Sequence, residues 1–170
     1  NTYFRIKQAV IDKYPNLIVF RTFSKAFGLA GLKYGFIFAS QQLLSTLRSR
    51  INQKCIPGMT TPIAVAALQN GKRIERFVEQ VSETKRILND RFNWNICTSA
   101  NFFTLDVLEF ERFRDCEIRH NIGTRSLSET YGIHSAHRIT LVGEKNRDRL
   151  VHFCDDLVRN SIVSGVHSYE

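Results

Sequence analysis

A lysine stands among small residues in the segment RTFSKAFGLAGLKYG, which covers positions 21–35. Lys25 follows an apolar run and precedes Gly28 and Gly31, so we expect it at the carboxyl end of a buried strand, where open α/β sheets bind their ligands. An amine held in a dry site has a lowered pKa and becomes a nucleophile that forms a Schiff base with a carbonyl. These residue types therefore point to covalent chemistry at Lys25.

The neighbours of this lysine suit a phosphate group. The hydroxyls of Thr22 and Ser24 can donate hydrogen bonds to phosphate oxygens, and Lys33 adds positive charge. The two glycines let the backbone approach a bound group closely. Together these features indicate an aldehyde cofactor that carries a phosphate. A glycine-rich turn that serves only tight packing is the alternative that the residues leave open.

The spacing of apolar residues predicts the elements that position this segment. The two continuous apolar runs predict strands buried on both faces of a parallel sheet. A hydroxyl cap followed by proline, at Thr60–Pro62, predicts the start of a helix that Asn70–Gly71 ends. The predicted elements are, in order, helix 3–14, strand 17–20, strand 35–39, helix 41–51, helix 60–70, a long amphipathic helix 72–92 that links two lobes, strand 93–99, strand 101–107, helix 111–120, strand 137–142 and helix 146–160.

Composition narrows the class of protein. The chain has 170 residues with 43% hydrophobic content and a net charge of +8, which fits one folded domain with part of another. It has no apolar run that could cross a bilayer and no signal peptide, so a cytoplasmic location without membrane contact is expected. Charges of both signs alternate in 71–86, which favours small anionic molecules over nucleic acid as partners. Four scattered cysteines predict reduced thiols and no metal site.

Residues 14–39 resemble the Schiff-base motif of fold-type I pyridoxal-phosphate enzymes. Within the class I/II aminotransferases they are most similar to the histidinol-phosphate aminotransferase group. The resemblance implies an α/β fold, with the remainder of the cofactor-binding large domain at 1–75 and a small α/β domain, including the linking helix, at 76–170. It covers the whole chain but only the C-terminal part of a family member. The aspartate that faces the pyridine nitrogen and the glycine-rich phosphate loop are therefore expected upstream.

The resemblance also implies roles for residues of the lysine segment. Lys25 would carry pyridoxal 5'-phosphate and move the proton between substrate and cofactor, and Thr22 and Ser24 would contact the cofactor phosphate. Lys33 stands where the family usually has an arginine that pairs with this phosphate. Lysine keeps the charge of arginine but loses its planar, bidentate fork.

A second segment, HRITLVGEKNRDRLVHF at 137–153, resembles the family's C-terminal strand and helix. Arg138 would be the arginine that clamps a substrate carboxylate there. Asn101 matches an asparagine with a structural role, and Arg125 matches a strand-edge arginine with a packing or substrate-adjacent role. No role is assigned to His120, His134, His137 and His152.

The implied function is transamination between an amine or amino acid and a 2-oxo acid. The resemblance to the histidinol-phosphate group implies that the amine substrate is phosphorylated. The intact protein is expected to be a homodimer in amino-acid biosynthesis, and the 170 residues alone are expected to be inactive. Two alternatives stay open. The same scaffold also runs decarboxylation of phosphorylated amino acids, and a truncated, non-catalytic relative would instead bind a partner.

Overall fold

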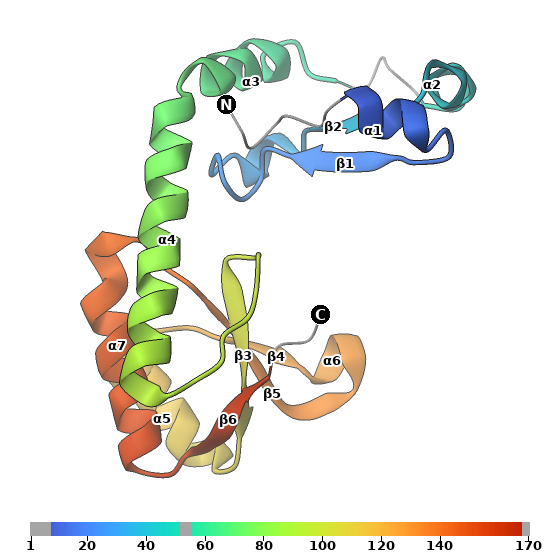
Figure 1. The fold of residues 1–170 in the computed structure, drawn as a ribbon. Coiled ribbons are helices and arrows are strands. Elements are labelled where there is room, and N and C mark those ends of the chain that lie inside the picture. Colours follow the sequence, from blue (N-terminus) through green and yellow to red (C-terminus); the bar gives the residue numbers. More distant parts are fainter. Residues whose placement is uncertain (1–7, 52–55, 168–170) are drawn as a thin grey trace. The chain divides into compact units, whose positions relative to one another are not determined.

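The computed structural model describes residues 8–51 and 56–167 (Figure 1). The chain divides into two compact units, Asn1–Arg76 and Phe77–Glu170. Helix α4 (Gly71–Phe92) starts in the first unit and continues into the second. That these units correspond to the rest of a cofactor-binding domain and to a small domain stays a prediction.

The first unit holds a two-stranded sheet and short helices. The pairing of its strands is antiparallel, with Val19 opposite Phe38 and Thr22 opposite Gly35. Its elements are α1 (Gln8–Lys13), β1 (Val19–Thr22), the 3₁₀ helix η2 (Ala30–Leu32), β2 (Gly35–Phe38), α2 (Gln41–Arg48) and α3 (Thr60–Gln69). The predicted helix over 3–14 is described from Gln8 onward, and its first residues lie outside the described part of the chain.

The prediction of parallel strands buried on both faces is wrong for this pair. The connection 23–34 contains only a single 3₁₀ turn, whereas neighbouring parallel strands need a crossover of a dozen or more residues, usually a helix. Phe20, in the middle of β1, is 72% exposed. The apolar run 17–20 therefore predicted this strand to within two residues, but it did not predict how far the strand is buried.

Helix α3 begins where the sequence predicted, but its cap differs. The residue at the N-cap is Met59, which makes no side-chain cap hydrogen bond, and Thr60 is buried in the first turn. The predicted hydroxyl cap is therefore wrong. The preceding helix α2 does have such a cap, because the hydroxyl of Ser40 accepts a hydrogen bond from the Leu43 amide at 3.4 Å.

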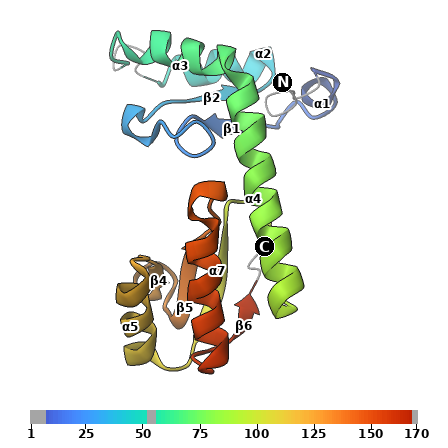
Figure 2. The ribbon, with the colours of Figure 1, turned by 90° about the vertical axis from the view of Figure 1, so that its left-hand side faces the viewer.

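The second unit is a four-stranded antiparallel sheet with the strand order β4-β5-β3-β6. Two helices, α5 and α7, cover one face of this sheet (Figures 1 and 2). The elements that follow α4 are β3 (Phe102–Val107), α5 (Phe110–His120), β4 (Arg125–Leu127), α6 (Ser128–Tyr131), β5 (Ile133–Thr140), α7 (Glu144–Arg159) and β6 (Val163–His167).

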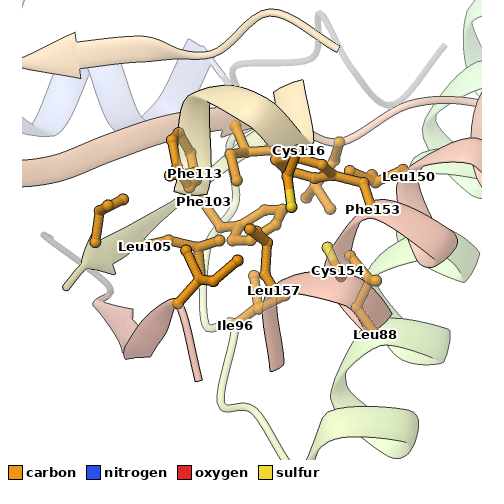
Figure 3. Close-up of a cluster of buried hydrophobic side chains, with 14 residues drawn as sticks. Leu88, Ile96, Phe103, Leu105, Phe113, Cys116, Leu150, Phe153, Cys154 and Leu157 are labelled. Atoms are coloured by element: carbon orange, nitrogen blue, oxygen red, sulfur yellow. The ribbon is translucent and has the colours of Figure 1, made fainter. Parts of the chain in front are cut away.

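The core of the second unit lies between the sheet and these helices. Figure 3 shows side chains of α7, such as Phe153 and Leu157, packed with Phe113 of α5 and with Phe103 and Leu105 of β3. All five are at most 3% exposed. A small unit gains most of its stability from such burial. Because the helices cover this face of the sheet, a binding site on the sheet would use the opposite face.

Strand predictions were mixed in the second unit. The strands at 101–107 and 137–142 are confirmed as β3 and as part of β5. The strand predicted at 93–99 is wrong, because this segment is irregular and its Trp94 and Ile96 serve the core. Strands β4 and β6 were missed: β4 has only three residues, and Gly165 interrupts the apolar pattern of β6. Within the described residues, no helix combines the length and the apolar character needed to cross a membrane.

Candidate functional site

The end of β1 places two hydroxyl groups next to Lys25. The Thr22 hydroxyl donates to the Ser24 hydroxyl at 2.9 Å and also lies 3.4 Å from the Tyr34 carbonyl oxygen, and the Ser24 amide donates to the Thr22 oxygen at 3.1 Å. Thr22 is exposed and Ser24 is half-buried. The structure thus brings together the two residues that the sequence assigned to a phosphate.

A buried aromatic side chain anchors the lysine loop. Phe23 is 2% exposed, and its ring lies 4.9 Å from that of Phe27, 5.7 Å from that of Tyr34 and 5.6 Å from that of Phe36. The backbone amide of Phe23 donates to the Tyr34 carbonyl oxygen at 3.2 Å. Phe23 is therefore fixed at both side chain and backbone, between the exposed Thr22 and the half-buried Ser24.

Lys25 itself lies in a turn with an exposed side chain. The turn is closed by the Gly28 amide, which donates to the Lys25 carbonyl oxygen at 3.0 Å, and Gly28 has the positive φ of 67° that favours glycine. The dry surroundings expected for Lys25 are therefore not formed by the described residues of this unit.

Lys33 is also exposed, and it ends η2 in the left-handed conformation with φ of 49°. Neither Lys25 nor Lys33 has a side-chain hydrogen bond or ion pair with another residue in the described part of the chain. Both amines are thus available to a ligand.

The strand pair that carries this loop depends on Gly35. A Cβ added at Gly35 would lie 2.5 Å from the carbonyl oxygen of Arg21, a backbone atom that cannot move alone. We expect Gly35→Ala to destabilise the first unit by about 1–3 kcal/mol and to speed hydrogen exchange at the Phe23 amide. The matched control is Gly31→Ala, since nothing lies within 4 Å of a Cβ there. Equal exchange rates in Gly35→Ala and the parent chain would contradict this prediction.

Two arginines lie side by side on the second unit's sheet. Arg138 of β5 pairs directly with Arg125 of β4 on one side and with Thr104 of β3 on the other. Residues directly opposite one another in antiparallel strands point to the same face, so both guanidinium groups extend from one face of the sheet. In the described part of the chain, neither arginine forms an ion pair or a hydrogen bond through its side chain.

This is the face of the sheet opposite α5 and α7. The next residue of β5, Ile139, is 2% exposed and belongs to the core beneath the helices, and side chains alternate between the two faces along a strand. Arg138 is half-buried, and its guanidinium carbon lies 4.9 Å from the centroid of the Phe102 ring, a diagonal neighbour on β3. A cation held against an aromatic face is restricted in orientation. Two unpaired cations in this arrangement are a candidate site for an anion.

The sequence missed three polar residues behind this arginine pair. Thr124 and His137 each precede one of the arginines. Thr124 donates to the Glu117 carboxylate of α5, and its hydroxyl is also hydrogen-bonded to His137. Burial lowers the pKa of His137 below its usual value, and the Glu117 carboxylate opposes this shift. The sequence alone gave no role to His137. The alternation of side chains along β5 (133–140) places it on the core side of the strand.

The remaining candidate residues have structural roles. Asn101 precedes β3, and its carbonyl oxygen accepts a hydrogen bond from the Leu141 amide at 2.8 Å. His120 lies 2.8 Å from Asp156 and, with Arg119, links α5 to α7. The hydrogen bond to His120 and then that to Arg119 lower the pKa of Asp156.

The thiols are unpaired wherever the structure describes them. Cys97 is exposed, while Cys116 and Cys154 are buried, and Cys55 lies outside the described residues. Burial raises the pKa of both buried thiols, which makes them unreactive. Over residues 8–51 and 56–167, no group of three or more His, Cys, Asp and Glu side chains is placed to hold a metal ion.

The chain is similar to known proteins over most of its length. Residues 3–154 match the family of class I and II aminotransferases. A histidinol-phosphate aminotransferase from Bacteroides thetaiotaomicron is 34% identical over 105 residues, which are 58% of this chain and 30% of that protein. The same enzyme from Cytophaga hutchinsonii is 29% identical over 148 residues, 84% of this chain and 42% of that protein.

The fold is also found among solved structures. Histidinol-phosphate aminotransferase from Sinorhizobium meliloti, in complex with pyridoxal-5'-phosphate, matches with a TM-score of 0.61 and 20% identity over 86% of this chain and 42% of that one. The chain therefore spans less than half the length of these relatives. Because the sequence match extends over most of its residues, the chain belongs to the class I and II aminotransferase family.

Proposed function

We propose that this chain supplies the cofactor lysine and the substrate-binding arginines of a pyridoxal-phosphate-dependent aminotransferase of the histidinol-phosphate type. The observation that carries the proposal is the placement of Lys25. Its amine is exposed at the end of β1, directly after the linked hydroxyls of Thr22 and Ser24. An exposed amine beside two hydroxyl donors suits an aldehyde that carries a phosphate.

The charge of the first unit supports a phosphate-bearing cofactor. Residues 1–76 contain only two acidic residues, Asp12 and Glu75, whereas lysines and arginines recur throughout. A positive field of this kind attracts anions. Pyridoxal phosphate, when bound, supplies an electron sink for the substrate α-carbon. Thr22, Ser24 and Lys33 would hold its phosphate, and the Lys25 amine would bind its aldehyde and accept or return the substrate proton.

The arginine pair supports an anionic substrate. Arg125 and Arg138 occupy paired positions on one face of the sheet and lack acidic partners among the described residues. Two guanidinium groups bind a phosphate or a carboxylate through charge-assisted hydrogen bonds. We therefore infer that the amine substrate carries a phosphate and that the 2-oxo acid uses the same cations. The homodimer is a prediction that rests on resemblance alone.

Borohydride trapping tests this proposal. The full chain is mixed with pyridoxal phosphate, reduced with borohydride, and mapped by peptide mass spectrometry. We expect one adduct, on Lys25, which disappears in Lys25→Ala and persists in the control Lys145→Ala, which removes an exposed lysine of α7. Labelling spread evenly over exposed lysines would contradict the proposal for this chain. In the intact enzyme, carbon dioxide release without 2-oxo acid consumption would assign decarboxylation instead.

A further inference from the structure

A chain of three polar side chains lies behind the arginine pair, on the helix-covered face of the sheet. The Glu117 carboxylate on α5 accepts hydrogen bonds from the Thr124 amide at 2.8 Å and from the Thr124 hydroxyl at 2.7 Å. The same hydroxyl lies 2.9 Å from Nδ1 of His137 on β5. We call Glu117, Thr124 and His137 the rear network.

The proton positions of the rear network follow from its acceptors. A carboxylate only accepts, so the single hydroxyl proton of Thr124 goes to Glu117. Nδ1 of His137 must then donate its own proton to the Thr124 oxygen. The other ring nitrogen, Nε2, is buried and has no hydrogen-bond partner among the described residues. A neutral ring with an unprotonated Nε2 is the form that fits, because a buried N–H without an acceptor costs more.

Aromatic rings hold this histidine in place. The ring of His137 is 4.8 Å from that of Phe113 and 5.8 Å from that of Phe110, and the residue is only 5% exposed. Its position therefore cannot shift without moving α5. The rear network thus ties β5, the segment before β4, and α5 into one rigid contact.

The members of this network are the direct chain neighbours of the two arginines. Thr124 precedes Arg125, and His137 precedes Arg138. Because successive side chains of a strand point to opposite faces, a tie between Thr124 and His137 on one face sets the separation of the two guanidinium stems on the other.

The sheet needs such a tie at this position. β4 is an edge strand of three residues, and its register against β5 shifts between Ser126 and Leu127, immediately after the arginine pair. Short edge strands with an irregular ladder have few hydrogen bonds to fix their register. The rear network adds side-chain bonds at the point where Arg125 and Arg138 pair.

We propose that Glu117, Thr124 and His137 are positioning residues that set the spacing of Arg125 and Arg138 and so determine the affinity of this pair for a phosphate-like dianion. The proposal rests on the role that the proposed function gives to the arginine pair. A network that only satisfies buried polar groups would influence stability and leave anion affinity unchanged, and this difference makes the two roles separable.

The test compares hydroxyl variants of the full chain in a titration with inorganic phosphate, followed by NMR of the arginine Nε–H signals. We expect Thr124→Val, which keeps the shape but removes the hydroxyl, to weaken phosphate binding by roughly 3- to 10-fold, because one hydrogen bond is worth about one such factor. Thr124→Ser, which restores the hydroxyl, should bind within twofold of the parent chain. Equal affinity in Thr124→Val and the parent would overturn the proposal.

The matched control is Ser126→Ala. Ser126 flanks Arg125 on its other side and lies opposite His137 in the β4–β5 ladder, but its hydroxyl bonds the Ser128 hydroxyl at 2.8 Å and no member of the rear network. We expect its loss to leave phosphate affinity unchanged. A loss of affinity in Ser126→Ala equal to that in Thr124→Val would show general softening of β4 and would also overturn the proposal.

A second variant, Glu117→Ala, separates positioning of the arginines from a direct electrostatic effect, because the two predict opposite changes in phosphate affinity. Glu117→Ala removes a negative charge from the second unit and leaves Arg114 without its ion-pair partner, which by electrostatics alone should strengthen phosphate binding. If Glu117 positions the arginines through Thr124, the same change weakens binding by roughly 3- to 10-fold. This variant also decides the matter if Thr124→Val does not fold.

The titration needs neither the cofactor nor turnover, so the two proposals fail separately. A chain that fails to trap pyridoxal phosphate on Lys25, yet loses phosphate affinity in Thr124→Val, refutes the proposed function and keeps the network. If pyridoxal phosphate is trapped on Lys25 and Thr124→Val leaves phosphate affinity unchanged, the proposed function is kept and the network proposal is refuted. A parent chain whose arginine signals do not respond to phosphate overturns the network proposal.

Discussion

Replacing Arg138 with methionine is expected to weaken the binding of inorganic phosphate by roughly 10- to 100-fold, because charge-assisted hydrogen bonds each contribute about 1.5–3 kcal/mol. Methionine keeps an unbranched apolar stem while it removes the cation that lies over the Phe102 ring. The expected loss is larger than for any variant of the rear network, because those residues act only through the arginines. Isothermal titration of the full chain measures it directly.

The control for this prediction is another arginine with a partner of its own. Arg91 donates to Asp155 at 2.7 Å, so its charge is already satisfied, and Arg91→Met should change phosphate affinity less than about twofold. If Arg125 and Arg138 hold the same anion, the double variant should also lose less than the sum of the single losses. Phosphate affinity in Arg138→Met that equals the parent value would remove the pair from the binding site.

The sequence predicted elements better than it predicted their pairing. Helices α4, α5 and α7 carry regular apolar spacing, and each lies within a few residues of its predicted position. The pairing of β1 with β2 depends on the length and content of the loop between them, which apolar periodicity does not describe. Short edge strands such as β4 also have too few residues to show alternation.

The candidate site was predictable one residue at a time. The lysine, the hydroxyls of Thr22 and Ser24, and Arg138 were identified from motifs. Their neighbours were not, because the partner of a residue across a sheet depends on register. That Arg125 lies opposite Arg138 follows only from the register of the β4–β5 ladder. The contacts of the rear network could not be predicted for the same reason.

The two groups of site residues belong to different units of the chain. Lys25 lies in the first unit and Arg138 in the second. Each group is built on its own small sheet, held by its own buried side chains: Phe23 under the lysine loop, and Phe113 under the arginine strands.

The largest loss of stability is expected from the core that supports the arginine face. Phe153 of α7 is fully buried close to Phe113 (Figure 3). Its ring lies 5.9 Å from the ring of Phe113 and 5.9 Å from that of His120. We expect Phe153→Ala to lower the free energy of unfolding of the second unit by about 3–5 kcal/mol, because it removes a large apolar side chain and leaves a cavity. Urea unfolding followed by Trp94 fluorescence reports on this unit, since Trp94 packs against the same core.

The matched control lies on the neighbouring helix. Ile118 of α5 is 74% exposed, so Ile118→Ala should change the free energy of unfolding by less than about 0.5 kcal/mol. Phe153→Leu should fall between the two, since it keeps most of the apolar volume. A small effect of Phe153→Ala in the Trp94 signal would mean that the second unit does not derive its stability from this layer. The arginine pair would then need another source of rigidity than the helices behind it.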